Sequence, residues 1–241
     1  MLEIINAQLR PNGEAFDHRF FDGGINVILG SNDSGKTNLC RFLTGLSSTA
    51  SGEVLIDGES YSKIPKRRPV SLVVQDFVNY PVWTVEENIN SPLRAQGDLK
   101  KKQISARTYE LGELLGLTDY LKKYPAELSG GQQQRVALGR ALAKNARIMI
   151  LDEPFVNLDY KLRESLRTEL KSLASNLDTT IIYSTMDPKE ALAIADDVLL
   201  INDYSFIQSG IPLEVYSCPV SILAADLMSD LRVNVFRSQK T

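Results

Sequence analysis

The chain has 241 residues, 43% of them hydrophobic, which is enough for one substantial core and a subdomain. The formal net charge is −3 and no long basic run occurs, so bulk electrostatics do not favour nucleic acid as a partner. The sequence lacks a signal-peptide pattern and any apolar stretch of roughly 18 residues, so we expect no membrane span. The two cysteines, Cys40 and Cys218, are far apart and lack metal-ligand spacing, which indicates a reduced, cytosolic chain.

The apolar segments alternate between strand and helix patterns along most of the chain. We expect strands at residues 2–8, 25–29, 53–57, 70–74, 147–151, 179–183 and 197–201, and helices at 37–45, 130–144, 160–175, 188–195 and within 212–231. Continuously apolar strands that alternate with helices predict a mainly parallel sheet covered on both faces, with an antiparallel β part at the N-terminus.

The middle of the chain interrupts this alternation. Residues 85–124 are mostly helical by pattern, with leucines recurring at helical spacing. We therefore expect a helical subdomain at about 77–140, inserted in an α/β domain over residues 1–235, with 236–241 as a tail.

A glycine-rich loop follows the second apolar strand and opens a helix. It fits the phosphate-binding pattern G-x-x-x-x-G-K-[ST] and consists of Gly30, Ser31, Asn32, Asp33, Ser34, Gly35, Lys36 and Thr37, with Asn38 next in the helix. Backbone N–H groups at such a loop stabilise phosphate charge, Lys36 would reach the β- and γ-phosphates, and Thr37 offers a hydroxyl to Mg²⁺. This pattern predicts a P-loop nucleotide-binding fold that uses ATP and Mg²⁺.

Two carboxylates end the apolar strand at 147–151. Ligands gather at the carboxyl ends of parallel strands, so Asp152 is expected in the Mg²⁺ shell and Glu153 as general base for an attacking water. Adjacent strand residues point to opposite faces, which would separate these two tasks.

The segment Leu128-Ser-Gly-Gly-Gln-Gln-Gln-Arg135 lies between the phosphate loop and the acidic pair. With those motifs it resembles the signature of ATP-binding cassette (ABC) ATPases, whose fold is a P-loop NTPase (RecA-like) α/β domain. The resemblance covers essentially the whole chain. It implies that Ser129, Gly130, Gly131 and Gln132 bind the γ-phosphate of ATP held by a second ATPase subunit. It also implies that Gln75 contacts Mg²⁺ and the attacking water, and that Asp159, in Asn157-Leu-Asp159, crosses the dimer interface.

Two further segments are similar to importers of carbohydrates, glycerol and glycerol phosphate: residues 75–89 and 210–219. This similarity implies transmembrane permease partners, an indirect solute-binding protein, and a position at the cytoplasmic face of the cell membrane. That group normally continues into a β-rich regulatory domain, and the chain stops at Thr241, about where such a domain would begin.

The chain departs from the family where a switch histidine is expected, because Met186 stands there. Met186 is interpreted either as a sign of a weakened hydrolytic site or as a core filler. The only histidine, His18, is expected on the surface or in a loop. The usual adenine-stacking aromatic residue is not evident in Arg10-Pro-Asn12, and Phe16 is the nearest substitute.

Together the motifs predict an ATP-hydrolysing subunit of an ABC importer for a carbohydrate, glycerol or related polyol. A mainly ATP-binding partner in a heterodimeric ATPase and a soluble, non-transport ABC ATPase remain open as alternatives.

Overall fold

The structure, a computed structural model, describes residues 1–63, 70–74, 78–97, 99–144, 146–155, 158–177, 179–230 and 234. The chain divides into two compact units, one of residues 1–21, 26–62 and 184–241, and the other of residues 22–25 and 63–183. Among the described residues, none of the helices combines the length and the apolar character that crossing a bilayer requires.

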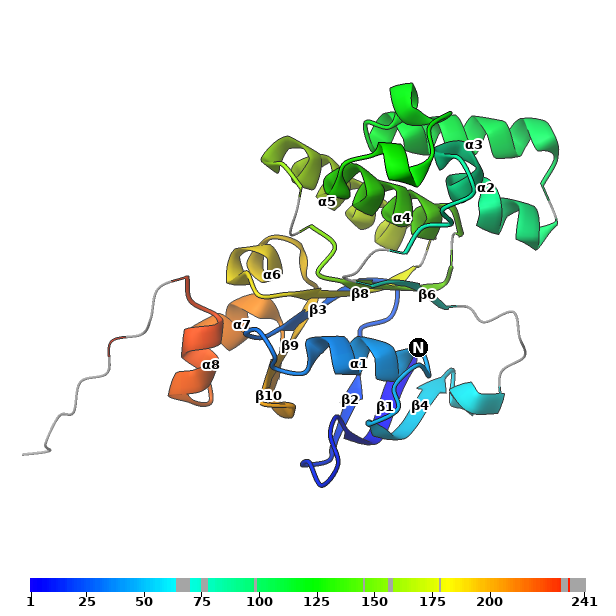
Figure 1. Cartoon of the computed structure of the whole chain (residues 1–241). Coiled ribbons are helices and arrows are strands. Elements are labelled where there is room, and N and C mark those ends of the chain that lie inside the picture. The colour runs from blue at the N-terminus through cyan, green and yellow to red at the C-terminus, as the bar shows by residue number, and fades with distance from the viewer. Residues whose placement is uncertain are drawn as a thin grey trace, which may run out of the picture. The chain divides into compact units, whose positions relative to one another are not determined.

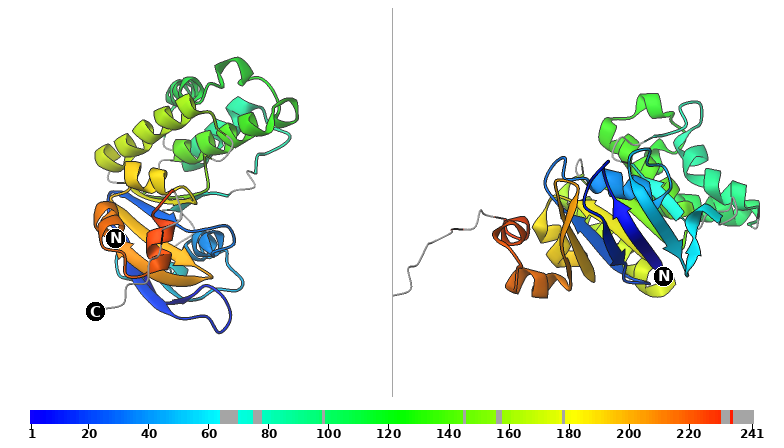
Figure 2. Two further views of the ribbon diagram at one scale, coloured as in Figure 1. Left: turned by 90° about the vertical axis from the view of Figure 1, so that its left-hand side faces the viewer. Right: turned by 90° about the horizontal axis from the view of Figure 1, so that it is seen from below.

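The first unit contains an antiparallel sheet, labelled in Figure 1, whose strand order is β2-β1-β4-β5. Its strands are β1 (Leu2–Gln8), β2 (Phe16–Arg19), β4 (Ser51–Ile56) and β5 (Glu59–Ser60). The register places Ile4 opposite both His18 and Val54. The strands of this sheet lie side by side in the right-hand view of Figure 2. This is the N-terminal antiparallel part that the sequence predicted.

A second, six-stranded sheet has the hydrogen-bonded order β10-β9-β3-β8-β7-β6. Its strands are β3 (Ile25–Leu29), β6 (Val70–Val73), β7 (Ile148–Asp152), β8 (Thr180–Thr185), β9 (Asp197–Asn202) and β10 (Ser205–Gly210). The pairs β3–β9 and β6–β7 are parallel, and β10 is antiparallel to β9. All residues of β3, β7 and β8 are buried, as continuously apolar strands predict.

Helices of the first unit flank its strands. They are α1 (Lys36–Leu43), α6 (Pro188–Ile194), α7 (Pro212–Ser217) and α8 (Ile222–Leu227). Helix α1 packs against β4, and α7 packs against β9 and β10. Leu39, Cys40 and Leu43 of α1 are fully buried, which confirms the expected core position of Cys40. Each such leucine contributes roughly 1.5–3 kcal/mol of burial free energy.

The second unit holds the long helices, which lie together in Figure 1. They are α2 (Val85–Gln96), α3 (Lys101–Leu114), α4 (Gly130–Lys144) and α5 (Tyr160–Leu177). Helix α2 begins with a capping box in which Thr84 and Glu87 bond each other's backbone N–H. Helices α2, α3 and α4 contact one another, and α4 also contacts β6. Gly139 of α4 makes this packing close, because a Cβ there would lie 2.8 Å from Leu115 Cδ1.

The predicted α/β fold with a mainly parallel sheet is confirmed, whereas three strands were missed: β2, β10 and the two-residue strand β5. The half-exposed strands β2 and β10 lack an apolar run, so hydrophobic patterning gave no signal for them.

Candidate functional site

The phosphate loop continues directly from the buried strand β3 in the first unit. The backbone N–H of Gly30 donates to the carbonyl of Thr185 at 3.3 Å, which ties the start of the loop to the end of β8. At Gly30 a Cβ would lie 2.4 Å from both the Ile201 carbonyl oxygen and Ser34 Oγ, so only glycine fits between these groups. The loop is therefore held against β8 and β9 by its backbone.

Lys36 turns its ammonium group into the loop. Its Nζ donates to the carbonyl oxygens of Gly30 at 2.9 Å and of Ser31 at 2.7 Å, and the residue is only 4% exposed. Ser34 Oγ is also buried, and it has no hydrogen-bond partner among the described residues. A buried cation and a buried hydroxyl without a partner, within one loop at a helix start, match the donor set that binds a phosphate.

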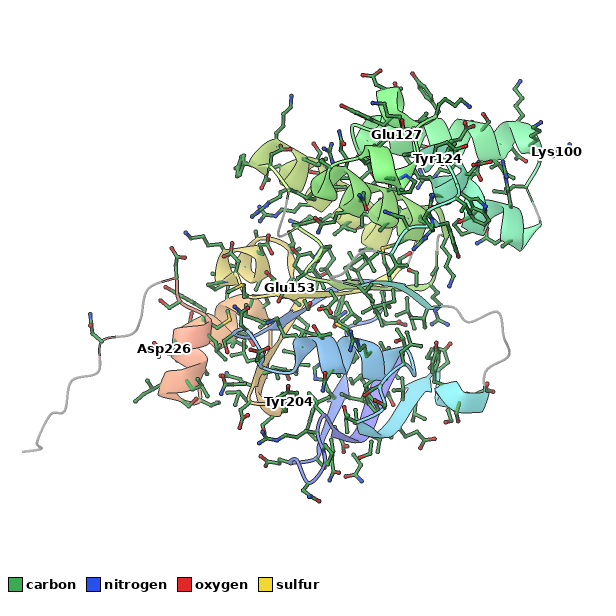
Figure 3. The ribbon with its side chains drawn as sticks, viewed as in Figure 1. Lys100, Tyr124, Glu127, Glu153, Tyr204 and Asp226 are labelled. Carbon is green, nitrogen blue, oxygen red and sulfur yellow. The ribbon has the colours of Figure 1, made fainter. Side chains whose placement is uncertain are left out.

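The second glycine of the loop is also required by its conformation. Gly35 has φ +104°, and a Cβ there would lie 3.0 Å from Tyr204 Cδ1. Tyr204 belongs to the turn between β9 and β10, where Figure 3 labels it, and its backbone N–H donates to the Ser34 carbonyl at 2.8 Å. The β9–β10 turn thus braces the phosphate loop, a role that the sequence patterns did not reveal.

The remaining predicted loop residues divide by exposure. Ser31, Asn32 and Asp33 are exposed, and Asp33 has a left-handed backbone with φ +57°. Thr37 is half-buried in the first turn of α1. Asn38 Nδ2 donates to the Leu9 carbonyl at 3.2 Å, so its amide anchors the end of β1 to the start of α1.

Met186 directly follows Thr185, whose backbone carbonyl accepts the hydrogen bond from Gly30 of the phosphate loop. Thr185 Oγ1 donates to Glu190 Oε2 at 2.6 Å, and the backbone N–H of Asp187 donates to Thr185 Oγ1 at 3.1 Å. Thr185 and Glu190 are buried, whereas Met186 is 50% exposed. The alternative that Met186 fills a core is therefore wrong. The exposed Met186 thioether has no N–H to donate, and Met186 follows the residue that is bonded to Gly30.

The acidic pair lies in the second unit. Asp152 is the last residue of β7 and is 2% exposed. Glu153 lies beyond the strand, with a left-handed φ of +47°, and is half-buried. The expectation that both residues belong to one strand is wrong, because β7 ends at Asp152 and the backbone bends at Glu153. Figure 3 labels Glu153 at this bend.

The signature segment caps helix α4 in the same unit. The Ser129 N–H donates to Gln132 Oε1 at 2.9 Å, and the Gln132 N–H donates to Ser129 Oγ at 3.4 Å. Ser129 and Gly130 are exposed and Gly131 is half-buried, so an exposed helix start with orphan N–H groups is available to an anion.

Gln134, two residues into the helix beyond Gln132, was missed by the sequence analysis. It is 4% exposed, and its Nε2 donates to the Pro154 carbonyl at 3.0 Å. This bond connects the signature helix to the residue that follows Glu153. The signal that could have found it is the polar run of three glutamines at 132–134 in the first turns of the helix.

Asp159 caps helix α5, because its Oδ1 accepts the backbone N–H of Leu162 at 3.0 Å. Gln75 and Asn157, both expected near the site, lie outside the described residues.

His18 also departs from expectation. It lies on β2 with its side chain 7% exposed, and its Nε2 is 3.6 Å from Asp197 Oδ2. Burial lowers the pKa of His18 to about 4 and raises the pKa of Asp197 to about 6. The expected surface or loop position is wrong, because the antiparallel register turns this residue toward the unit's interior.

A buried strand, a glycine-rich loop with a lysine, and a helix that begins at this loop follow one another in the chain. This arrangement defines a phosphate-loop nucleotide-binding protein. The family profile described as ABC transporter matches residues 15–156, and the chain belongs to this family. The structure of "the ATP-binding cassette MJ0796 bound to ADP and Pi", described as dimeric and post-hydrolysis, superposes with a TM-score of 0.79 at 25% identity and covers 88% of this chain and 99% of that one.

Curated relatives are import ATP-binding proteins with different solutes. The spermidine/putrescine protein PotA of Thermotoga maritima is 42% identical over 84% of this chain and 55% of its own length. The xylose/arabinose protein XacJ of Haloferax volcanii is 36% identical over 89% of this chain and 56% of its own length. The oligosaccharide protein MsmX of Bacillus subtilis is 35% identical over 97% of this chain and 64% of its own length. The chain thus spans little more than half the length of these relatives.

Proposed function

We propose that this chain binds and hydrolyses ATP as the nucleotide-binding subunit of an ABC importer. The observation that carries the proposal is the phosphate loop, in which the Lys36 ammonium and the unpartnered Ser34 hydroxyl are buried together. Family membership and the import ATP-binding relatives support the transport role.

The phosphate-loop residues Lys36 and Thr37 would have separate tasks in ATP binding. The Lys36 ammonium donates hydrogen bonds to two backbone carbonyl oxygens. Phosphate oxygens would compete with these carbonyls for the ammonium, because charged acceptors form stronger hydrogen bonds. Thr37 would supply a hydroxyl, an oxygen ligand that Mg²⁺ prefers. The proposed role of Asp152 as a carboxylate ligand rests on its sequence motif, since Asp152 belongs to the second unit. When bound, Mg²⁺ neutralises charge on the phosphates.

Hydrolysis would depend on the bend after β7. Glu153 would accept a proton from the attacking water, a contribution of roughly 10²–10⁴ in rate for a positioned general base. The bond from Gln134 to the Pro154 carbonyl would hold this bend in place. Catalysis would come from positioning and electrostatics, as is typical of phosphoryl transfer.

The signature segment would act on ATP bound by a second ATPase subunit, because its helix start, at Ser129 and Gly130, is exposed. Asp159 would contribute to the same interface. We further propose permease partners, a solute-binding protein that acts indirectly, and a position on the cytoplasmic face of the cell membrane. The solute would be a carbohydrate, glycerol or related polyol. The XacJ and MsmX relatives support that class, while the PotA relative names a polyamine.

A second candidate is a mainly ATP-binding partner within a heterodimeric ATPase. Met186 favours it, because an exposed thioether has no N–H to offer to developing phosphate charge. Losing one preorganised donor typically costs about 2.7–4 kcal/mol of transition-state stabilisation.

Steady-state Mg-ATP hydrolysis tests both candidates, with Glu153→Gln as the blank and Met186→His as the restored form. We expect slow hydrolysis by the parent chain above the blank, and faster hydrolysis by Met186→His. A parent rate at the blank with a rise in Met186→His would favour the heterodimer. Absence of ATP binding, measured by calorimetry with Lys36→Ala as control, would refute both candidates.

A further inference from the structure

The hairpin between β9 and β10 meets the phosphate loop at several residues of the first unit. Ser31 Oγ donates to Asn202 Oδ1 at 3.5 Å. The Tyr204 backbone N–H donates to the Ser34 carbonyl at 2.8 Å. At Gly35 a Cβ would lie 3.0 Å from Tyr204 Cδ1 and 3.1 Å from Tyr204 Cα, so the tyrosine and the glycine are immediate neighbours. The turn of the hairpin therefore lies against the segment that would bind the phosphates.

The residues of this turn do not match its backbone conformation. Asp203 and Tyr204 connect β9 to β10, and their φ angles are +46° and +62°. A two-residue hairpin turn with a positive φ at both residues strongly favours glycine at the second residue, because glycine adopts this conformation without a steric penalty. An aromatic side chain at that position is an outlier. Strain of this kind persists where the surrounding structure over-determines the conformation, and strained residues cluster at ligand-binding sites.

A second group holds the Tyr204 ring. The Arg10 guanidinium carbon lies over the ring, 5.6 Å from its centroid. Arg10 also donates to both carboxylate oxygens of Asp203, with Nη1–Oδ1 2.8 Å and Nη2–Oδ2 3.0 Å. The guanidinium and the two turn residues therefore fix one another, and this restrains the ring beside Gly35.

Gly35 is the residue of the phosphate loop for which such a restraint matters most. Its φ of +104° is accessible to glycine, and glycine has more conformational freedom than any other residue when nothing restrains it. Gly35 also directly precedes Lys36, whose Nζ reaches back to the Gly30 and Ser31 carbonyls. Motion at Gly35 would displace the Lys36 ammonium relative to the rest of the loop. A loop that is already fixed binds phosphate without the entropy loss of ordering it.

We propose that Tyr204 is a positioning residue for phosphate binding, whose ring, held by Arg10, restrains Gly35. The strained turn is retained because glycine at position 204 would relieve the strain but remove this restraint. The inference rests on the proposed ATP binding and adds to it a residue that lies about 170 positions beyond the phosphate-loop motif. The Tyr204 N–H is present whatever the side chain, so a substitution at this position tests the ring.

The test separates the ring from the backbone of the turn. Tyr204→Gly and Tyr204→Asn both remove the ring and keep the N–H, and glycine and asparagine both tolerate a positive φ. Tyr204→Phe keeps the ring. Asn12→Gly is the matched control, since Asn12 also has a positive φ, +58°, in an exposed turn of the same unit. Dissociation constants of ATP and of inorganic tripolyphosphate are measured by calorimetry, and the urea midpoint of unfolding is measured for every protein.

The expected result is a loss of affinity that follows the ring and not the stability. We expect Tyr204→Gly and Tyr204→Asn to weaken ATP and tripolyphosphate by the same factor, about tenfold. The two variants should share this loss whichever way their urea midpoints move. Tyr204→Phe and Asn12→Gly should bind both ligands within about twofold of the parent.

Several outcomes would overturn the proposal while leaving ATP binding intact. Parent-like affinity in both variants that lack the ring would do so, as would a loss in Tyr204→Phe as large as in Tyr204→Gly. An affinity loss that follows the fall of the urea midpoint from variant to variant would assign Tyr204 to stability alone. A loss for ATP without a loss for tripolyphosphate would show that the ring acts on another part of the nucleotide. A parent that binds neither ligand would overturn the proposed function together with this inference.

Discussion

The buried pair His18 and Asp197 gives a prediction whose sign and size follow from its geometry. The two side chains are 7% and 20% exposed, and Nε2 and Oδ2 are 3.6 Å apart. Burial lowers the pKa of His18 from 6.5 to about 4 and raises the pKa of Asp197 from 3.8 to about 6. Between about pH 4 and 6 the folded pair and the unfolded pair therefore each hold one proton.

Because the folded and unfolded pairs bind the same number of protons, this pair makes the free energy of unfolding of the parent nearly independent of pH in this range. In each single variant, the free energy of unfolding depends on pH. In Asp197→Asn only His18 remains, and its folded pKa is below the unfolded value. Stability is present above about pH 6.5 and is lost as the pH falls to about 4. In His18→Gln only Asp197 remains, with a raised folded pKa. Stability is then present below about pH 3.8 and is lost as the pH rises to about 6. Each slope is about 1.4 kcal/mol per pH unit, and each total is about 3 kcal/mol.

The assay is the free energy of unfolding in urea from pH 4.5 to 7.5, expressed as the difference between each variant and the parent so that other carboxylates cancel. His18 is the only histidine, so its imidazole resonance can be titrated by NMR without assignment. Opposite slopes in the two variants are expected. Parallel curves for all three proteins, or an imidazole that titrates near pH 6.5 in the parent, would refute the reasoning.

Three further substitutions probe the site and its frame. Gly35→Ala meets Tyr204 and an unfavourable φ of +104°, so we expect about 1–3 kcal/mol of destabilisation and a large loss of ATP affinity by calorimetry. Gln134→Leu removes the donor to the Pro154 carbonyl. We expect kcat to fall about tenfold while the ATP dissociation constant changes little. A larger change in the ATP dissociation constant than in kcat would contradict this role. Gly139→Ala overpacks helices α2–α4 and should lower stability by about 1–3 kcal/mol in thermal unfolding, with ATP affinity unchanged in the folded protein.

The sequence predicted the elements that hydrophobic pattern and glycine chemistry specify. Strand β3, the phosphate loop and helix α1 follow from an apolar run, two glycines and a lysine at fixed spacing. The acidic residues at the end of β7 follow from the same logic. These features are local in sequence, so one sequence suffices to find them.

Contacts between residues far apart in the chain could not be predicted in this way. Arg10 meets Asp203 and Tyr204 across more than 190 positions, and His18 meets Asp197 through strand register rather than spacing. The bend at Glu153 is a backbone conformation that the apolar strand pattern does not encode. Each case depends on tertiary packing, which sets partners and burial independently of local propensity.

The loop that carries Met186 shows why this substitution can be tested cleanly. The buried bond from Thr185 to Glu190 and the Asp187 N–H fix the loop backbone without using the Met186 side chain, which points into solvent at 50% exposure. Replacing Met186 by histidine therefore introduces a donor without opening a cavity or disturbing the core. A change in hydrolysis rate with unchanged unfolding free energy would report the chemistry of position 186 alone, because the fold around it is held by other residues.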